Sequence, residues 1–256
     1  MTSSHRHVVI TGGAGRLGCA AARHFLAAGA SVLLADIDEV ALARAASELA
    51  GRALHTLRCD VADPADCARL VQHAEARFGG PLDVFLANAG RPFAGPLAQA
   101  DPNEVQRVIE VNVTGSILSA QAALASLVRG REPCLLFTGS LQSVAGRAER
   151  SVYTASKHAI AGLVKALALE FGPQGVRVNG VAPTVVDTPF LRTAYAQAGI
   201  SVEEALQAAA RGLPLGRIPT ADDFAATAVF LASPAASAIT GQMVMVDCGA
   251  SAGKFG

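Results

Sequence analysis

The sequence predicts an α/β protein with a single domain, built on a doubly wound parallel sheet of about seven strands with helices on both faces. Short apolar, β-branched runs alternate along the chain with longer alanine-rich segments of helical period. Some strand segments are apolar throughout, such as Val-Phe-Leu-Ala at 84–87. Such strands are typical of a parallel sheet that is buried on both sides, because right-handed βαβ crossovers place helices on each face.

The expected elements follow in order along the chain. Strands are predicted at 7–11, 31–35, 53–58, 82–87, 134–138, 176–181 and 243–246, and helices at 15–28, 40–50, 63–78, 103–128, 151–171 and 222–231. Asp63 is expected to cap the third helix, because its carboxylate can accept the unpaired N–H groups of the first turn. No repeat or linker divides the chain, so residues 1–256 are expected to form one domain.

The stretch 184–219 is the long irregular segment of this pattern, with prolines at and around both ends. A long ordered excursion within a compact domain is usually functional. We therefore expect this stretch to be a substrate lid.

Composition narrows the class of protein. Lys plus Arg and Asp plus Glu number 21 each, so nothing suggests the basic surface of a nucleic-acid-binding protein. The five cysteines are odd in number and lack C-x-x-C spacing, which favours reduced thiols over disulfides or a metal site. The N-terminus has no apolar signal region and no apolar run reaches the ~18 residues of a membrane span. We expect a cytoplasmic protein that acts on a small molecule, without nucleic acid, membrane or metal.

A glycine-rich turn follows the first strand. Residues 11–18 read Thr-Gly-Gly-Ala-Gly-Arg-Leu-Gly and lead into a helix. Glycines allow close approach to a pyrophosphate, and the helix N-terminus offers it free N–H groups. Asp36 ends the second strand, where an acid accepts hydrogen bonds from ribose hydroxyls and disfavours a 2′-phosphate, so NAD is expected rather than NADP. The alternatives are an ordinary turn and an Asp36 that only caps the next helix, although Asp38 could do that.

Four polar residues suggest the chemistry. Tyr153 and Lys157 are four residues apart on a predicted helix and therefore share a face. A phenol has a pKa near 10, and a neighbouring ammonium would lower it, so that Tyr153 could carry the proton of a ketone–alcohol interconversion. Ser140 follows a strand and could donate to the substrate oxygen, and Asn112 could hold a water or backbone group that links Lys157 to solvent. Taken singly, each has an ordinary structural explanation.

With these motifs in order, the sequence resembles the short-chain dehydrogenase/reductase family, which has a Rossmann fold, from His7 to about Ala250. The resemblance rests on Thr11-Gly12-x-x-x-Arg16-x-Gly18, Asp60-Val61, Asn88-Ala89-Gly90 and the set Asn112, Ser140, Tyr153 and Lys157, which matches the family's catalytic tetrad. It implies a homotetramer or homodimer, with helices 103–128 and 151–171 and the last strand at the interfaces. The expected cofactor-binding residues are Gly12, Gly15, Arg16, Leu17, Gly18, Asp36, Asp60, Val61, Asn88, Ala89, Gly90, Tyr153, Lys157, Pro183, Val186 and Thr188.

One departure from the family pattern concerns the cofactor. Arg16 stands where the family has the middle glycine of its turn. Its side chain could crowd the phosphate, add a cation to it, or shift the preference toward NADP, against Asp36.

The substrate is less defined by the sequence. Gln142 and Phe190 are expected near it, and Arg147, Glu149 and Arg150 precede Tyr153. These residues suggest a medium-sized substrate with polar groups, but surface charges would explain the arginines equally well. Polyols or sugars, cyclic or aromatic alcohols, hydroxysteroids and 3-oxoacyl thioesters all remain candidates.

The sequence therefore leads to one main hypothesis and two alternatives. The main hypothesis is an NAD(H)-dependent oxidoreductase that interconverts a secondary alcohol and a ketone, with Tyr153 as general acid and base. One alternative is an NADPH-dependent 3-oxoacyl thioester reductase. The other, from a different class, is a non-catalytic dinucleotide-binding sensor.

Overall fold

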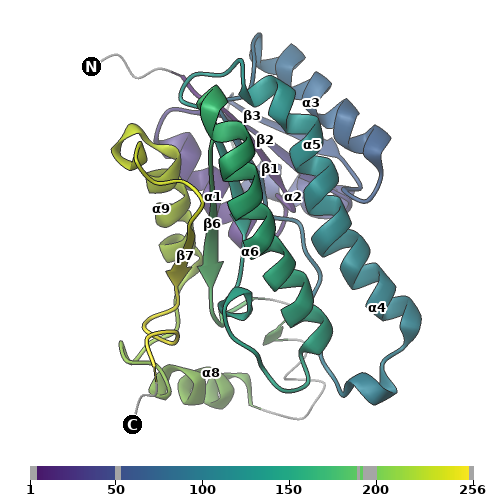
Figure 1. The fold of residues 1–256 in the computed structure, drawn as a ribbon, viewed down its shortest axis with the longest axis vertical. Coiled ribbons are helices and arrows are strands. Elements are labelled where there is room, and N and C mark those ends of the chain that lie inside the picture. Colours follow the sequence, from purple (N-terminus) through teal and green to yellow (C-terminus); the bar gives the residue numbers. More distant parts are fainter. Residues whose placement is uncertain (1–4, 50–52, 189–190, 193–200, 254–256) are drawn as a thin grey trace.

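A single parallel sheet forms the centre of the molecule (Figure 1). The computed structural model describes residues 5–49, 53–188, 191–192 and 201–253. Within these residues seven strands pair in the order β3-β2-β1-β4-β5-β6-β7. The strands are β1 (His7–Thr11), β2 (Ser31–Asp36), β3 (Leu54–Arg58), β4 (Val84–Ala87), β5 (Cys134–Thr138), β6 (Arg177–Pro183) and β7 (Met243–Val246). The predicted fold class is confirmed.

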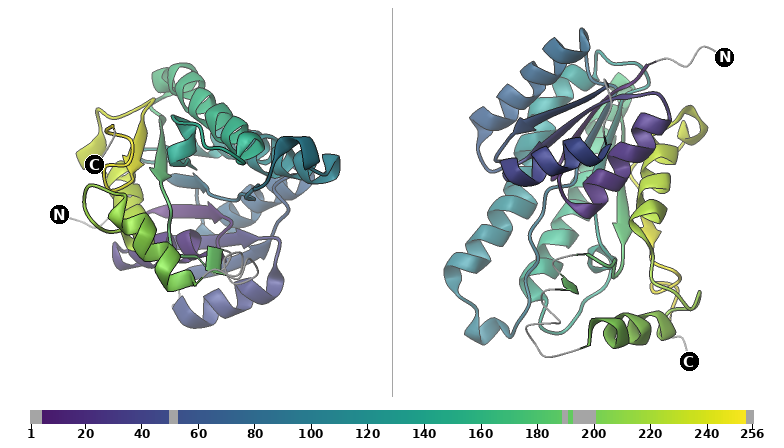
Figure 2. Two further views of the ribbon diagram at one scale, coloured as in Figure 1. Left: turned by 90° about the horizontal axis from the view of Figure 1, so that it is seen from below. Right: turned by 180° about the vertical axis from the view of Figure 1, so that it is seen from behind.

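Helices cover both faces of the sheet (Figures 1 and 2). One face carries α1 (Arg16–Ala27), α2 (Glu39–Leu49) and α9 (Ala221–Ala232), and the other carries α3 (Pro64–Phe78), α5 (Gly115–Leu127) and α6 (Ser151–Phe171). Successive strand residues alternate between the two layers, so that Val8 and Ile10 pack under the first set of helices and Val9 packs under the second. Two buried apolar layers therefore fix the sheet.

The strand order places a crevice at one edge of the sheet. The chain runs from β1 outward to β3 on one side and from β4 outward to β7 on the other. The loops that leave β1 and β4 therefore diverge, and in such sheets ligands bind beyond the carboxyl ends of the strands at this point. Helix α8 (Val202–Arg211) lies beyond the same end of the sheet (Figure 1).

The long helix expected at 103–128 is interrupted. Helix α4 (Pro102–Ile109) passes into a π-helical turn at Glu110–Thr114 before α5 begins. A π turn holds one extra residue, costs hydrogen-bond geometry, and frequently marks a functional site. Asn112 lies in this turn, so the irregularity coincides with a predicted site residue.

The segment from α4 to α5 also qualifies the expectation about membranes. Pro102–Leu127 is long and apolar enough to cross a bilayer by length and composition, so the expectation that no segment would reach that length was wrong. The same segment packs on α3 and α6, and three of its serines, Ser116, Ser119 and Ser126, are buried within the protein. These contacts indicate a core helix.

The prediction of an irregular stretch at 184–219 was wrong in part. Helix α8 forms within it, and the Ser201 hydroxyl accepts the Glu204 N–H at 3.4 Å. Glu203 and Glu204 lie in the first turn, where negative side chains are favourable. Ser201-x-x-Glu204 is therefore a signal for a helix N-terminus, which was missed because the prolines of this stretch favoured irregular structure. A lid function for this stretch stays a prediction.

Two smaller expectations were correct. The Asp63 side chain accepts the Ala65 N–H at 2.8 Å and caps α3. All five cysteines are free thiols.

The expected interfaces with further copies stay predictions. Apolar side chains remain exposed on α5 and α6, among them Ile117 and Leu169. Exposed apolar surface of this kind would accommodate a second copy, and sedimentation velocity would measure the assembly. The cytoplasmic location likewise stays a prediction.

Candidate active site

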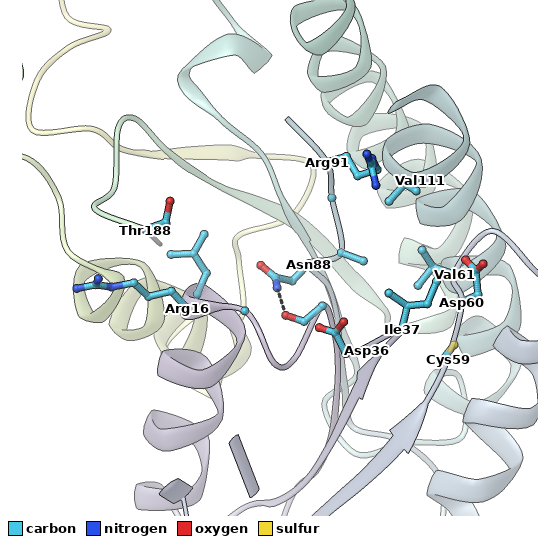
Figure 3. A pocket seen from close by; sticks show the side chains of 15 residues that line it. Arg16, Asp36, Ile37, Cys59, Asp60, Val61, Asn88, Arg91, Val111 and Thr188 are labelled. Carbon is cyan, nitrogen blue, oxygen red and sulfur yellow. Dashed lines mark hydrogen bonds between the residues drawn. The ribbon is translucent and has the colours of Figure 1, made fainter. Parts of the chain in front are cut away.

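A cavity of about 360 Å³ lies beyond the carboxyl ends of β1, β2 and β4 (Figure 3). It extends from the start of α1 to the ends of β2 and β3. Its lining includes eleven of the residues expected to bind a cofactor: Gly12, Gly15, Arg16, Leu17, Asp36, Asp60, Val61, Asn88, Ala89, Gly90 and Thr188. Ile37, Cys59, Arg91 and Val111 line it as well, and the sequence motifs had not indicated these four.

Glycines are required in the turn before α1 and in the first turn of α1 itself. Gly12 has a φ of 59°, and a Cβ there would lie 2.8 Å from the Ala89 Cα. A Cβ on Gly18 would lie 2.4 Å from the Gly12 carbonyl oxygen. Gly15 is the N-cap of α1 and provides no side chain to the helix end. The N–H groups of the first turn are therefore available to an anion, which fits a cofactor pyrophosphate.

Replacing Gly18 by alanine is expected to weaken cofactor binding at least tenfold, because the turn must shift to relieve the contact with Gly12. Calorimetric titration with NAD⁺ measures the change. Gly162→Ala is the control, since a Cβ at that helical position meets nothing within 4 Å and alanine favours helix. Equal affinities for both variants would show that the turn does not hold the cofactor.

Asp36 lines the cavity, and a different residue caps the next helix. The Asp36 carboxylate accepts the N–H groups of Ala14 at 3.1 Å and Asp38 at 3.2 Å, and it lines the cavity. The Asp38 carboxylate accepts the Ala41 N–H at 2.9 Å in the first turn of α2. Asp38 thus provides the cap, and the alternative reading of Asp36 loses its basis.

Arg16 lines the cavity, but its guanidinium points away from Asp36 (Figure 3). Its Nη1 lies 3.8 Å from the Asp187 carboxylate, in the segment after β6. Arg192 holds Asp187 in turn, at 2.7 and 2.9 Å, and these contacts keep the pKa of Asp187 low. The side chain of Arg16 is therefore directed to the opposite side of the cavity from the place where a 2′-phosphate would lie beside Asp36.

Asn88 joins the glycine turn to the neighbouring strands. Its side chain donates to the Gly12 carbonyl at 2.9 Å and accepts from the Thr138 hydroxyl at 2.9 Å. The Thr11 hydroxyl accepts the backbone N–H groups of Asn88 and Ala89 at 3.1 and 3.3 Å. Thr138 was not indicated by the sequence motifs, and Thr11 was named only as the first residue of the glycine motif. Their signal is their position, since each is the last residue of its strand.

The remaining predicted cofactor residues have diverse surroundings. Asp60 accepts the Ala62 N–H at 2.9 Å, and Val61 is packed against Gly115. Pro183 is buried at the end of β6, where it pairs with Val246, and it does not line this cavity. Val186 lies outside this cavity as well and lines a different one, together with Ser140 and Tyr153.

A second cavity, of about 630 Å³, adjoins the first, and Thr188 lines both. Ser140, Gln142 and Tyr153 line it. The Gln142 side chain accepts a hydrogen bond from the Thr154 hydroxyl at 3.1 Å, while its backbone is fixed by Ser140. Phe190, the other predicted substrate residue, lies outside the described residues.

Ser140 and Tyr153 lie together in this cavity. The Ser140 oxygen accepts the Gln142 N–H at 3.2 Å, so its own proton is left for a second partner. Burial raises the pKa of the Tyr153 phenol above its ordinary value, and a hydrogen bond with Ser140 and the charge of Arg150 oppose that rise. The pair is therefore placed to share one oxygen atom of a substrate.

Lys157 lies one turn after Tyr153 and is buried. Its ammonium donates to the Thr138 carbonyl at 2.8 Å and lies 5.6 Å from the centroid of the Tyr153 ring. Burial lowers the pKa of Lys157 to about 8. The amine is thus mostly protonated at neutral pH and brings a positive charge close to the phenol.

Asn112 holds the backbone of Arg91, while a link from Lys157 to solvent through Asn112 stays a prediction. Its side-chain oxygen accepts the Arg91 N–H at 2.7 Å, and its amide donates to the Arg91 carbonyl at 2.9 Å and to the Ser156 hydroxyl at 3.1 Å. The π turn therefore anchors the loop after β4 and the helix that carries Tyr153. Within the described ranges, no group of His, Cys, Asp or Glu side chains is placed to hold a metal ion.

Comparisons with known proteins give the same family for nearly the whole chain. The family model described as Enoyl-(Acyl carrier protein) reductase matches residues 13–251. The chain is 38% identical to momilactone A synthase of Oryza sativa, over 95% of this chain and 89% of that protein. It is 37% identical to cis-4-hydroxycyclohexanecarboxylate dehydrogenase of Sinomonas cyclohexanicum, over 97% and 98%.

A solved structure agrees with these matches. An oxidoreductase of the short chain dehydrogenase/reductase family from Burkholderia thailandensis superimposes with a TM-score of 0.88 at 35% identity, covering 98% of this chain and 94% of the other. The sequence and structural matches extend over both cavities. The chain therefore belongs to the short-chain dehydrogenase/reductase family of oxidoreductases.

Proposed function

We propose that this protein is an NAD(H)-dependent oxidoreductase that interconverts a secondary alcohol and a ketone, with Tyr153 as general acid and base. One observation carries the proposal. The buried Lys157 ammonium lies 5.6 Å from the Tyr153 ring, and Tyr153 and Ser140 line a cavity that adjoins the cofactor cavity. Burying a cation costs folding free energy, so a buried cation beside a phenol supports a role for both groups in proton transfer.

The protein's own groups would move the proton. In the direction of oxidation, the Tyr153 phenolate takes the proton of the substrate hydroxyl while Ser140 donates a hydrogen bond to the same oxygen. Lys157 stabilises the phenolate by its charge, and the Thr138 carbonyl holds the ammonium in place. NAD⁺, when bound, supplies the acceptor for the hydride that leaves the carbinol carbon. In reduction Tyr153 returns the proton.

Asp36 supports NAD as the cofactor. Its carboxylate is fixed by two backbone N–H groups at the edge of the cavity, where it would accept hydrogen bonds from ribose hydroxyls and repel a 2′-phosphate. The direction of Arg16 toward Asp187 supports the same preference, since this cation does not face the Asp36 end.

Asp36→Ala is expected to lower kcat/KM for NAD⁺ about 10- to 100-fold, the worth of a hydrogen bond to a charged group. It is expected to raise the relative use of NADP⁺, because the repulsion is removed. Initial rates with each cofactor measure both effects. Asp38→Ala is the matched control, and should cost about 1 kcal/mol of stability through the lost cap while leaving the cofactor preference unchanged. A wild-type preference for NADP⁺ would contradict our reading of Asp36.

The second cavity supports a ring-bearing alcohol as substrate. Its volume of about 630 Å³ suits a medium-sized molecule. The name of one relative, cis-4-hydroxycyclohexanecarboxylate dehydrogenase, indicates a cyclic secondary alcohol for that protein. We propose a cyclic secondary alcohol or ketone here too. A panel of such compounds, followed by the absorbance of the reduced cofactor, tests the proposal, which would fail if none supported turnover.

The alternative of a thioester reductase is supported by the acyl-carrier-protein substrate in the family model's description and by a similar solved structure, a 3-ketoacyl-(acyl-carrier-protein) reductase from Brucella melitensis, at 30% identity and a TM-score of 0.87. It requires turnover of a 3-oxoacyl thioester with NADPH. The same panel, extended with acetoacetyl thioesters, separates the two activities.

A further inference from the structure

The substrate cavity combines apolar walls with a charged rim. Phe93, Leu141, Val185 and Leu191 supply apolar surface. Arg147, Glu149 and Arg150 line the same cavity, from the segment that leads into α6. The arginines that the sequence left open as surface charges therefore belong to the substrate site.

The charged rim, residues 147–150, is fixed to the opposite wall. The Gly95 N–H donates to the Glu149 carbonyl at 2.9 Å, and the Arg150 Nη1 donates to the Phe93 carbonyl at 3.0 Å. The Arg150 N–H closes a turn on the Arg147 carbonyl at 3.2 Å. Three hydrogen bonds thus hold the backbone of the rim and the Arg150 guanidinium in one arrangement before a substrate enters.

The sign of the charged rim is positive. The rim contains two arginines and one glutamate, and Arg147 forms no ion pair with a carboxylate of the described residues. Other arginines near the site have such partners, as Arg91 has Glu104 and Arg192 has Asp187. The charge of Arg150 also reaches the phenol, because it lowers the pKa of Tyr153. An anionic group in this cavity would be attracted to the rim.

The charged rim and the reacting groups line one cavity. Arg147 and Arg150 line it together with Tyr153 and Ser140, and Arg150 directly precedes the helix that carries Tyr153. One molecule in this cavity can therefore meet Tyr153 with its hydroxyl and the rim with an acid group.

We propose that this site selects a secondary alcohol that also carries a carboxylate, and that Arg147 and Arg150 bind the carboxylate. The inference rests on the proposed function, whose reaction it leaves unchanged, and it assigns the specificity to two residues of the charged rim. Guanidinium groups suit this role because their planar donors match a carboxylate.

Two matched probes test the inference: 4-hydroxycyclohexanecarboxylate and the neutral 4-hydroxycyclohexanecarboxamide, each as cis and trans isomers. The wild-type protein is expected to oxidise the preferred isomer of the acid with a kcat/KM at least tenfold above that of the amide. Added salt should reduce this ratio, because the rim is partly exposed. Arg147→Glu should lower the ratio at least tenfold, and Arg147→Lys should lower it less.

Arg44→Glu is the matched control, a charge reversal at an exposed arginine of α2, and should leave the ratio unchanged. A wild-type ratio of one or less, or a ratio that Arg147→Glu does not alter, would overturn the inference. Calorimetric binding of 4-oxocyclohexanecarboxylate and its carboxamide keeps the two proposals separate. If neither alcohol is oxidised but the acid binds better and loses that advantage in Arg147→Glu, the anion site stands and the proposed reaction fails. Equal binding of both ketones would overturn the anion site.

Discussion

Tyr153→Phe is expected to lower kcat about 10²- to 10⁴-fold, the range for loss of a general acid or base. The change removes one oxygen atom and keeps the ring, which is packed against Val108 and Phe93 near the second cavity. Ser140, the other hydroxyl proposed to meet the substrate oxygen, cannot take its place, because the hydroxyl of serine is a far weaker acid than a phenol.

The affinity for NAD⁺ and the melting temperature serve as controls for this variant. Both should stay close to the wild-type values, because the cofactor cavity is lined by residues other than Tyr153. Stopped-flow and steady-state rates with a cyclic alcohol measure the loss. Turnover that survives the change would disprove the proposed role of the phenol. Lost NAD⁺ affinity would show that the variant acts through binding instead.

Lys157→Met is expected to have two large effects, a loss of activity and a gain of stability. The variant should lose activity about 100-fold or more, because the phenolate loses its stabilising charge. It should also gain stability. Burial lowers the pKa of Lys157 from 10.5 to about 8, which corresponds to roughly 3 kcal/mol that the folded protein loses by holding the ammonium.

The stability that Lys157→Met is expected to gain depends on pH. Because the folded pKa is lower than the unfolded one, the folded protein binds fewer protons than the unfolded chain between pH 8 and 10.5. The cost of the buried charge is fully present below about pH 8 and disappears as the pH rises toward 10.5. Urea unfolding should therefore show the largest gain for Lys157→Met at neutral pH, and a smaller gain at pH 10.

Lys165→Met is the matched control, since Lys165 lies on the exposed side of the same helix. It should change neither activity nor stability by more than about 0.5 kcal/mol. A Lys157→Met variant that is less stable than wild type at pH 7 would show that the bond to the Thr138 carbonyl outweighs the cost of burial.

The sequence was sufficient for the fold because its local and global signals agree. The strand runs are apolar enough to be buried on both faces, and Asp63 marks the start of α3. Where local signals compete, the predicted secondary structure was less accurate. Helix α8, which Ser201 caps, was not predicted because nearby prolines favoured irregular structure. The π turn at Asn112 was not predicted because the helical period is continuous there and one extra residue does not change the composition.

The candidate site was only partly accessible to sequence reasoning. Residues that act by side-chain chemistry, such as Tyr153 and Lys157, could be selected from their type and spacing. Residues that act through backbone, such as the carbonyl of Thr138, carry no such mark. The neighbours of the charged rim depend on contacts across loops, as between Gly95 and Glu149, and these appear only in three dimensions.

The π turn at Glu110–Thr114 sets the rotational phase of two helices at once. An added residue turns everything beyond it by about 100° around the helix axis. This offset lets Val108 on α4 pack toward Phe93 while Ala120 and Ala123 on α5 face the sheet. Asn112 lies at the change of phase, so the loop after β4 is anchored where the two faces meet. The number of residues in this segment is consequently fixed, since the deletion of one residue within it would rotate one of the two apolar faces into solvent.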